Sequence, residues 1–159
     1  MSLSAADVEY LRRCVDLARQ ALEAGDEPFG SLLLDADGAG RFEDHNHVAG
    51  GDATRHPELA IALWAVEHLT PAERAAATVY TSGEHCPMCA AAHAWVGLGR
   101  IVYAASSAQL TGWLQAWDAP VPPVAALPIS AIAPGLPVDG PALELADTMK
   151  ALYERAFRR

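Results

Sequence analysis

The chain has 159 residues, of which 52% are hydrophobic, and its formal net charge at pH 7 is −9. This length and apolar content suffice to bury a core in one domain spanning residues 1–159, and they exclude an intrinsically disordered chain. The 11 lysines and arginines are outnumbered by 20 aspartates and glutamates, which argues against nucleic acid as the main partner. No apolar run approaches the roughly 20 residues that cross a bilayer, so we expect no membrane segment.

Cysteine usage and the N-terminus indicate a reducing compartment. The three cysteines are an odd number, and Cys86 and Cys89 form a Cys-x-x-Cys pair. Such a pair favours metal binding or thiol chemistry over a disulfide framework. The first residues lack the basic start and apolar core of a secretory signal. We therefore expect a cytoplasmic protein in which the third cysteine, Cys14, is a buried and unreactive thiol.

The first half of the chain predicts a helix, a hairpin and a second helix, in that order. Apolar residues recur at helical spacing after Ser4, which with Asp7 resembles a capping box, and the run ends at Gly25. Two β-type segments then flank a turn, and a proline suited to a first helical turn opens another amphipathic stretch. These later elements are expected at residues 29–34, 41–48 and 57–69.

The second half predicts strands that alternate with helices, followed by a proline-rich segment. We expect strands at residues 78–81 and 101–104, and helices at residues 86–97, 110–118 and 141–157. Most of the stretch from 120 to 141 is expected to be loop, with residues 129–133 as a candidate edge strand. The order of these elements predicts a three-layer α/β domain with helices on both faces of a sheet.

Two motifs bring together side chains that bind zinc. His56-x-Glu58 is followed, thirty residues after the histidine, by Cys86-x-x-Cys89. A structural zinc site is closed by four protein ligands, whereas a catalytic site keeps one position open for water. The motifs therefore predict one catalytic Zn²⁺ per chain, held by His56, Cys86 and Cys89. Glu58 would take up and return protons beside the metal.

Two other interpretations of these motifs remain open at this point. A Cys-x-x-Cys pair that opens a helix after a strand also occurs in thioredoxin-like redox proteins, although here no βαβ unit precedes it. Alternatively, His93 lies one helical turn after Cys89 and could complete a closed site of two cysteines and two histidines. Zinc would then only stabilise the fold.

The order of the two motifs resembles the cytidine deaminase-like superfamily of zinc-dependent nucleobase and nucleoside deaminases. The similarity continues in the segments around the motifs, namely Pro28 to Gly30, Asn46, Thr81 to Glu84, and Val102 to Ala105. The last of these segments, together with Ala90 to Ala92 and Trp95 before it, is most similar to guanine deaminases and tRNA adenosine deaminases. The resemblance covers about residues 5–112, and we expect residues 106–159 to be variable.

The resemblance implies a fold, a reaction and an assembly. The family's fold is a three-layer α-β-α sandwich around a mixed sheet of five strands, and its members are usually homodimers or higher oligomers. Its reaction is hydrolytic deamination, in which water replaces an exocyclic amino group and ammonia leaves. We therefore expect a small heterocyclic substrate such as a free nucleobase. A tRNA adenosine deaminase is the first alternative, and a non-catalytic zinc-stabilised or thiol-redox protein is the second.

The resemblance also implies contacts with the substrate. Asn46 would hydrogen-bond the base, Phe29 would border the pocket, and the backbone carbonyl of Glu84 would accept from the departing amino group. His85 stands where the family usually has proline, so it would either offer hydrogen bonds at the pocket edge or lie exposed in a loop. Guanine deaminases carry an aspartate near the position of Gln109, which puts guanine itself in doubt.

Several aromatic side chains lie outside the motifs. We expect Trp95 in the core, while Trp113 and Trp117 would serve in packing or stack on a base. Phe157 resembles an aromatic residue that some family members place over the pocket from the final helix. Two histidines flank Asn46 and are expected at the surface, namely His45 and His47.

Overall fold

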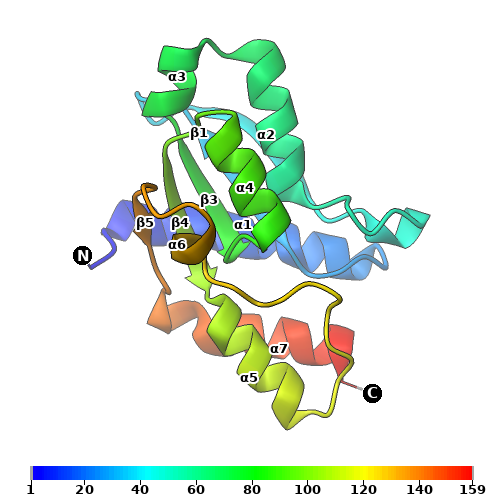
Figure 1. The fold of residues 1–159 in the computed structure, drawn as a ribbon. Coiled ribbons are helices and arrows are strands. Elements are labelled where there is room, and N and C mark those ends of the chain that lie inside the picture. Colours follow the sequence, from blue (N-terminus) through cyan, green and yellow to red (C-terminus); the bar gives the residue numbers. More distant parts are fainter. Residues whose placement is uncertain (1, 159) are drawn as a thin grey trace.

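The computed structural model describes residues 2–158, and its centre is a five-stranded sheet (Figure 1). In space the strands follow the order β2-β1-β3-β4-β5. Strand β1 is antiparallel to β2 and β3, whereas β3, β4 and β5 are parallel, so the sheet is mixed as predicted. The strands are Gly30–Leu34 (β1), Gly40–His45 (β2), Thr78–Gly83 (β3), Arg100–Ala105 (β4) and Val138–Asp139 (β5).

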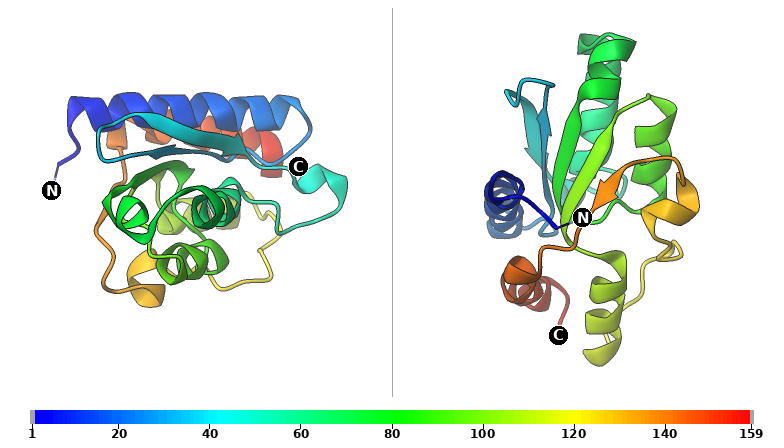
Figure 2. Two further views of the ribbon diagram at one scale, coloured as in Figure 1. Left: turned by 90° about the horizontal axis from the view of Figure 1, so that it is seen from above. Right: turned by 90° about the vertical axis from the view of Figure 1, so that its left-hand side faces the viewer.

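Helices cover both faces of this sheet, which confirms the predicted three-layer sandwich (Figure 2). Helices α1 and α7 lie on one face, and α2 and α4 lie on the other. The helices are Ala5–Glu23 (α1), Pro57–His68 (α2), Pro71–Ala76 (α3), Pro87–Trp95 (α4), Ser107–Ala116 (α5), Ile129–Ile132 (α6) and Ala146–Phe157 (α7). Two 3₁₀ turns are Val48–Gly50 (η1) and Leu143–Leu145 (η2). Within residues 2–158 no helix combines the length and the apolarity needed to cross a bilayer.

Side chains of the central strands alternate between two apolar cores, because successive residues of a strand point to opposite faces. Leu32 and Leu34 pack with the helices α1 and α7, while Leu33 between them packs with α2. The side chains of strand β3 alternate in the same way. Tyr80 faces α1 and its neighbour Val79 faces α2.

Two helices begin with a proline directly after a residue of the zinc motifs. His56 is the N-cap of α2, and Cys86 is the N-cap of α4. Proline suits this first position, since its missing N–H group would have no partner there. The two helices pack against each other, so their N-terminal ends lie close together.

A buried carboxylate connects the first helix to the sheet. Asp7 is 6% exposed, caps α1 together with Ser4, and accepts a hydrogen bond of 2.7 Å from the Tyr80 hydroxyl. The Arg100 guanidinium donates to both of its oxygens, at 2.9 and 3.2 Å, and also to Asp139 at 2.8 Å. Burial alone would raise the pKa of Asp7, but these donors outweigh burial and hold the pKa well below its ordinary value of 3.8.

The segment beyond residue 118 departs from the prediction. Residues 129–132 form helix α6 instead of an edge strand, because Ile129 is 1% exposed and packs against Ala90 and Ile101. The edge strand is β5, which pairs with β4. The last helix begins at Ala146 rather than at Pro141.

Two smaller differences have local causes. Helix α3 was not expected, yet Thr70 and Glu73 form a capping box around its first turn. Trp95 is 89% exposed, so its prediction as a core residue was wrong. The buried side of α4 carries Cys89 and His93, and Trp95 lies on the opposite side of that helix.

Replacing Asp7 with asparagine should lower the free energy of unfolding by about 2 kcal/mol, because Arg100 would lose one of its two carboxylate partners. Folding lowers the pKa of Asp7, so its contribution is present above about pH 4 and is lost as the pH falls below that value. Urea unfolding at neutral and acidic pH measures both effects. Asp16→Asn, an exposed position on the same helix, is the control and should change stability by less than about 0.5 kcal/mol. Equal stability of Asp7→Asn and the wild type at neutral pH would contradict this account.

Candidate active site

The three predicted zinc ligands meet where two helices begin. His56 precedes α2, Cys86 precedes α4, and Cys89 lies in the first turn of α4. The Nδ1 atom of His56 is 3.6 Å from Sγ of Cys86 and 3.5 Å from Sγ of Cys89. One potential ligand atom from each residue lies within 4.8 Å of the other two. The fold thus joins residues that are thirty positions apart in the sequence.

These distances fit a zinc ion. Zinc–nitrogen bonds of about 2.1 Å and zinc–sulfur bonds of about 2.3 Å at a tetrahedral angle separate the nitrogen and sulfur atoms by about 3.6 Å. Both observed separations agree with that value. Two thiolates and one imidazole are ligands that zinc prefers, and three ligands leave one position open.

Hydrogen bonds among the three predicted ligands shift their pKa values. The hydrogen bond with Cys89, together with the one to His56, lowers the pKa of Cys86 to about 4. The bond to Cys86 raises the pKa of His56 to about 9. The bond with Cys86 and burial raise the pKa of Cys89. At neutral pH the metal-free ligands are therefore one thiolate, one imidazolium and one thiol.

Zinc binding should release about two protons per ion between about pH 4 and pH 9, since His56 and Cys89 must lose their protons and Cys86 has already lost its own. The logarithm of the zinc dissociation constant should therefore rise by about two for each pH unit of acidification. Competition with a chelator of known pH dependence measures this slope. Glu58→Gln keeps all three ligands and should give the same slope, whereas a slope near zero in the wild type would contradict these proton assignments.

Glu58 lies in the first turn of α2, two residues after His56, and is 5% exposed. Its Oε1 atom accepts a hydrogen bond of 2.9 Å from the Thr81 hydroxyl, which fixes the carboxyl group. Burial raises the pKa of Glu58 above its ordinary value of 4.5. A carboxyl group shifted in this direction can both accept and return a proton nearer to neutral pH.

Asn46 is 1% exposed, so the hydrogen bonds of its side-chain amide must be satisfied within the protein or by a ligand. Its side-chain Oδ1 atom accepts from the backbone N–H groups of Glu27 and Val48, at 3.3 and 3.0 Å. The backbone N–H group of Asn46 donates to the carbonyl of Phe29 at 3.0 Å. Its Nδ2 atom has no hydrogen-bond partner among residues 2–158. Buried polar groups normally bind protein, water or ligand, so this amide is available to a ligand.

His85 is 1% exposed, so it is not a solvent-exposed loop residue. Neither of its ring nitrogens has a partner within the described part of the chain. Its ring meets that of His93 edge to face, with 5.3 Å between the centroids. Burial lowers the pKa of His85 well below 6.5, so the neutral ring offers one donor and one acceptor.

Glu84 has a structural role that the sequence did not indicate. Its Oε2 atom accepts from the N–H group of Ser107 at 2.8 Å, and its Oε1 atom accepts from that of Ile129 at 2.9 Å. The side chain of Glu84, two residues before Cys86, therefore holds the starts of α5 and α6. The predicted contact from the Glu84 backbone carbonyl to a substrate stays a prediction.

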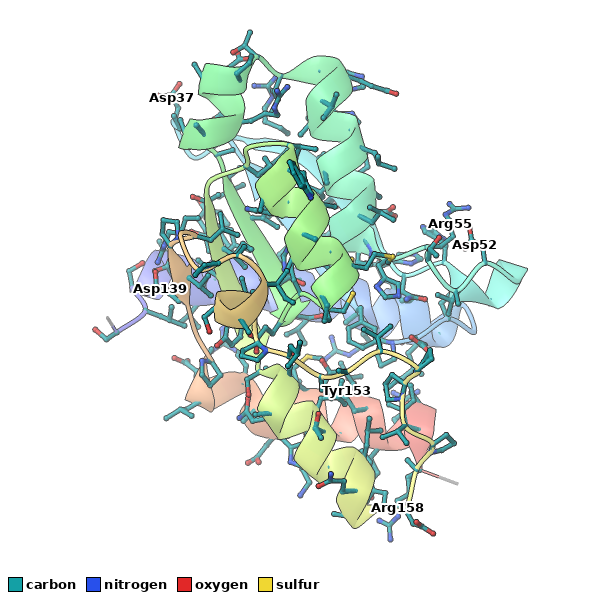
Figure 3. All side chains as sticks on the ribbon, in the orientation of Figure 1. Asp37, Asp52, Arg55, Asp139, Tyr153 and Arg158 are labelled. Atoms are coloured by element: carbon teal, nitrogen blue, oxygen red, sulfur yellow. The ribbon has the colours of Figure 1, made fainter. Side chains whose placement is uncertain are left out.

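Tyr153 of α7 also lies at this end of the sheet and was missed by the sequence prediction (Figure 3). It is 1% exposed, and its ring centroid is 5.5 Å from that of Phe29 and 6.1 Å from that of Phe157. A Cβ atom at Gly83 would lie 2.8 Å from the Tyr153 hydroxyl, so a side chain there would collide with it. The one available signal was the spacing of Tyr153 and Phe157, four residues apart on an amphipathic helix.

The other residues considered from the sequence take part in packing. Nε2 of His93 lies 2.7 Å from the carbonyl oxygen of Gly99. Within residues 2–158, His56 is the histidine whose ring nitrogen lies close to both cysteine sulfur atoms. This arrangement does not support a closed site that includes His93. Trp113 and Trp117 pack against the core under α1 and α7, as the packing alternative predicted.

The chain belongs to the family described as the cytidine and deoxycytidylate deaminase zinc-binding region, which matches residues 4–105. A probable cytosine deaminase from Schizosaccharomyces pombe is 34% identical over 110 residues, or 68% of this chain and 65% of that protein. A guanine deaminase from Bacillus subtilis is 36% identical over 98 residues, or 60% of this chain and 62% of that protein. The chain thus spans slightly less than two thirds of the length of these curated relatives.

Solved structures show the same fold. A guanine deaminase from Nitrosomonas europaea superimposes with a TM-score of 0.69 at 21% identity, over 98% of this chain and 86% of that one. A tRNA:A34 deaminase has a TM-score of 0.56 at 29% identity, over 64% of this chain and 78% of that one.

Proposed function

We propose that the protein is a zinc-dependent hydrolytic deaminase of a free nucleobase or a similar small nitrogen heterocycle. The observation that carries this proposal is the three-ligand centre with the buried carboxyl group of Glu58 beside it. Membership of the deaminase family and the likeness to cytosine and guanine deaminases support the same reaction class.

Glu58 would move the protons of the reaction. A zinc ion, when bound, would supply the Lewis acidity that makes water a better nucleophile at neutral pH. Glu58 would accept a proton from that water and deliver it to a ring nitrogen, then transfer a second proton to the departing amino group. The Thr81 hydroxyl would keep Oε1 of Glu58 oriented during both transfers. In the balanced reaction the oxygen of water becomes the carbonyl oxygen of the product, and the amino group leaves as ammonia.

Buried polar atoms that have no hydrogen-bond partner among residues 2–158 would recognise the heterocycle. The Nδ2 atom of Asn46 would donate to an acceptor on the ring, and His85 would offer one donor and one acceptor. Phe29, which packs against Tyr153, would border the ring, and the backbone carbonyl of Glu84 would accept from the amino group before it leaves. A planar heterocycle with alternating donors and acceptors has matching chemistry.

The charge distribution disfavours tRNA, the main alternative within the family. Arg12 pairs with Glu144, and Arg13 pairs with Glu43, so these two basic side chains in the middle of α1 are already compensated by carboxylates. Contacts with phosphate need free cations whose counterions are released on binding. The likeness to a tRNA:A34 deaminase keeps this alternative within the test below.

We further propose that residues 1–159 form one deaminase domain that works in the cytoplasm as a homodimer or higher oligomer. Three large apolar side chains on the adjacent helices α2 and α4 support an association surface, since exposed apolar groups close to one another often mark interfaces. Their exposed fractions are 60% for Leu63, 51% for Val66 and 89% for Trp95.

The zinc-loaded protein should release ammonia from at least one member of a panel of guanine, adenine, cytosine, isocytosine, aminotriazines, pterins and the corresponding nucleosides. Glu58→Gln should keep zinc but lower turnover by about a thousandfold, because the proton carrier is lost. Glu67→Gln, an exposed position on the same helix, is the matched control and should keep full activity.

Full turnover in Glu58→Gln would contradict the mechanism. A silent panel together with salt-sensitive tRNA binding would instead favour the tRNA alternative. A silent panel together with loss of zinc and unfolding in His93→Gln would favour a structural zinc site.

A further inference from the structure

A second group of potential metal ligands lies apart from the proposed zinc centre. Asp26, His45 and His47 each offer one ligand atom, and the three atoms lie within 4.8 Å of one another. Asp26 follows α1, His45 ends β2, and His47 comes two residues later. All three residues are partly buried, whereas we expected the two histidines at the open surface.

Hydrogen bonds to the protein orient both histidine rings. Nδ1 of His45 lies 2.8 Å from the backbone carbonyl oxygen of Asn46, and Nε2 of His47 lies 2.8 Å from Oδ1 of Asp44. Both partners are acceptors, so these nitrogens carry the protons. In each neutral ring the other nitrogen then has a free lone pair. Histidines that bind metals typically donate their second N–H group to a carboxylate or a backbone carbonyl in this way.

The spacing of the rings also fits a shared ion. The centroids of the His45 and His47 rings are 4.5 Å apart. Two imidazoles that bind one metal through bonds of about 2.1 Å have centroids about 4.5 Å apart when the angle at the metal is near 90°. The carboxylate of Asp26 is fixed by a hydrogen bond of 2.9 Å from the N–H group of Ala49 to its Oδ1 atom.

We propose that Asp26, His45 and His47 form a second metal site, which takes a divalent transition-metal ion. Two histidines and one carboxylate on one side of an ion leave its remaining positions to water or another ligand. Nitrogen ligands favour nickel, zinc or copper(II) over magnesium and calcium, which prefer oxygen. The carboxylates of Asp26 and Asp44 would offset the charge of the ion.

The second site adjoins a residue of the proposed active site. His45 donates to the backbone carbonyl of Asn46, so an ion on His45 and His47 would hold the chain on both sides of that asparagine. This consequence rests on the proposed function, and it predicts that the ion changes KM for the heterocycle more than kcat. Metal binding itself does not depend on the function, so a failure of the deaminase assay would leave the metal count as a separate test.

Titration of the zinc-loaded protein with Ni²⁺, followed by elemental analysis of both metals, tests the site. One nickel ion per chain should be added while the zinc content stays constant, and Mg²⁺ should not bind in its place. In calorimetry His47→Gln and Asp26→Asn should each weaken nickel binding by at least about tenfold. His68→Gln is the matched control, because it removes an exposed histidine of α2 and should leave the affinity unchanged.

Paramagnetic broadening gives a second readout that needs no variant. In wild-type protein with labelled histidines, Ni²⁺ should broaden the imidazole signals of His45 and His47 before the signals of His68. Nickel that displaces zinc without adding a second equivalent would overturn the proposal. Equal affinity in His47→Gln, Asp26→Asn and the control would overturn it as well, and so would broadening that is strongest at His68.

Discussion

The candidate site depends on one constraint, which is that the N-terminal ends of α2 and α4 must lie next to each other. His56 and Cys86 are N-caps, and the prolines after them fix where α2 and α4 start. The packing of these helices on one face of the sheet brings the imidazole within 3.6 Å of both sulfur atoms. Because the unpaired N–H groups of each first turn favour negative charge, the same arrangement suits thiolates and a carboxylate.

Strand β3 connects this site to the rest of the fold through two adjacent hydroxyl groups. The Tyr80 hydroxyl donates to Asp7 under α1, and the Thr81 hydroxyl donates to Glu58 on the opposite face. Because successive side chains of a strand point to opposite faces, Tyr80 stabilises the contact with α1 and Thr81 orients Glu58. The two faces differ in one physical respect. Both carboxylate oxygens of Asp7 accept hydrogen bonds, whereas among residues 2–158 the His85 ring nitrogens and Nδ2 of Asn46 are buried without a hydrogen-bond partner. This costs stability and leaves these atoms available to a ligand.

The sequence alone predicted those elements whose formation depends on neighbouring residues. A capping box opens α1 and prolines open α2 and α4, and the strand patterns predicted the sheet. The two motifs also indicated that His56, Cys86 and Cys89 lie together, while their binding of zinc stays a prediction. The sequence was insufficient where tertiary contacts decide. In helix α6 Ile129 packs against Ala90 and Ile101, and the side of α4 that packs on the sheet leaves Trp95 exposed. Tyr153 likewise approaches Phe29 and Gly83 from a segment that is distant in the sequence, so no local pattern predicted it.

X-ray absorption at the zinc edge of the zinc-loaded protein tests the central claim most directly, since it reports the ligands themselves. We expect two sulfur atoms at about 2.3 Å, one imidazole and one further light atom from solvent. The spectrum should be unchanged in His93→Gln. Two imidazoles in the wild-type spectrum, one of which is lost in that variant, would show a closed structural site and contradict the account.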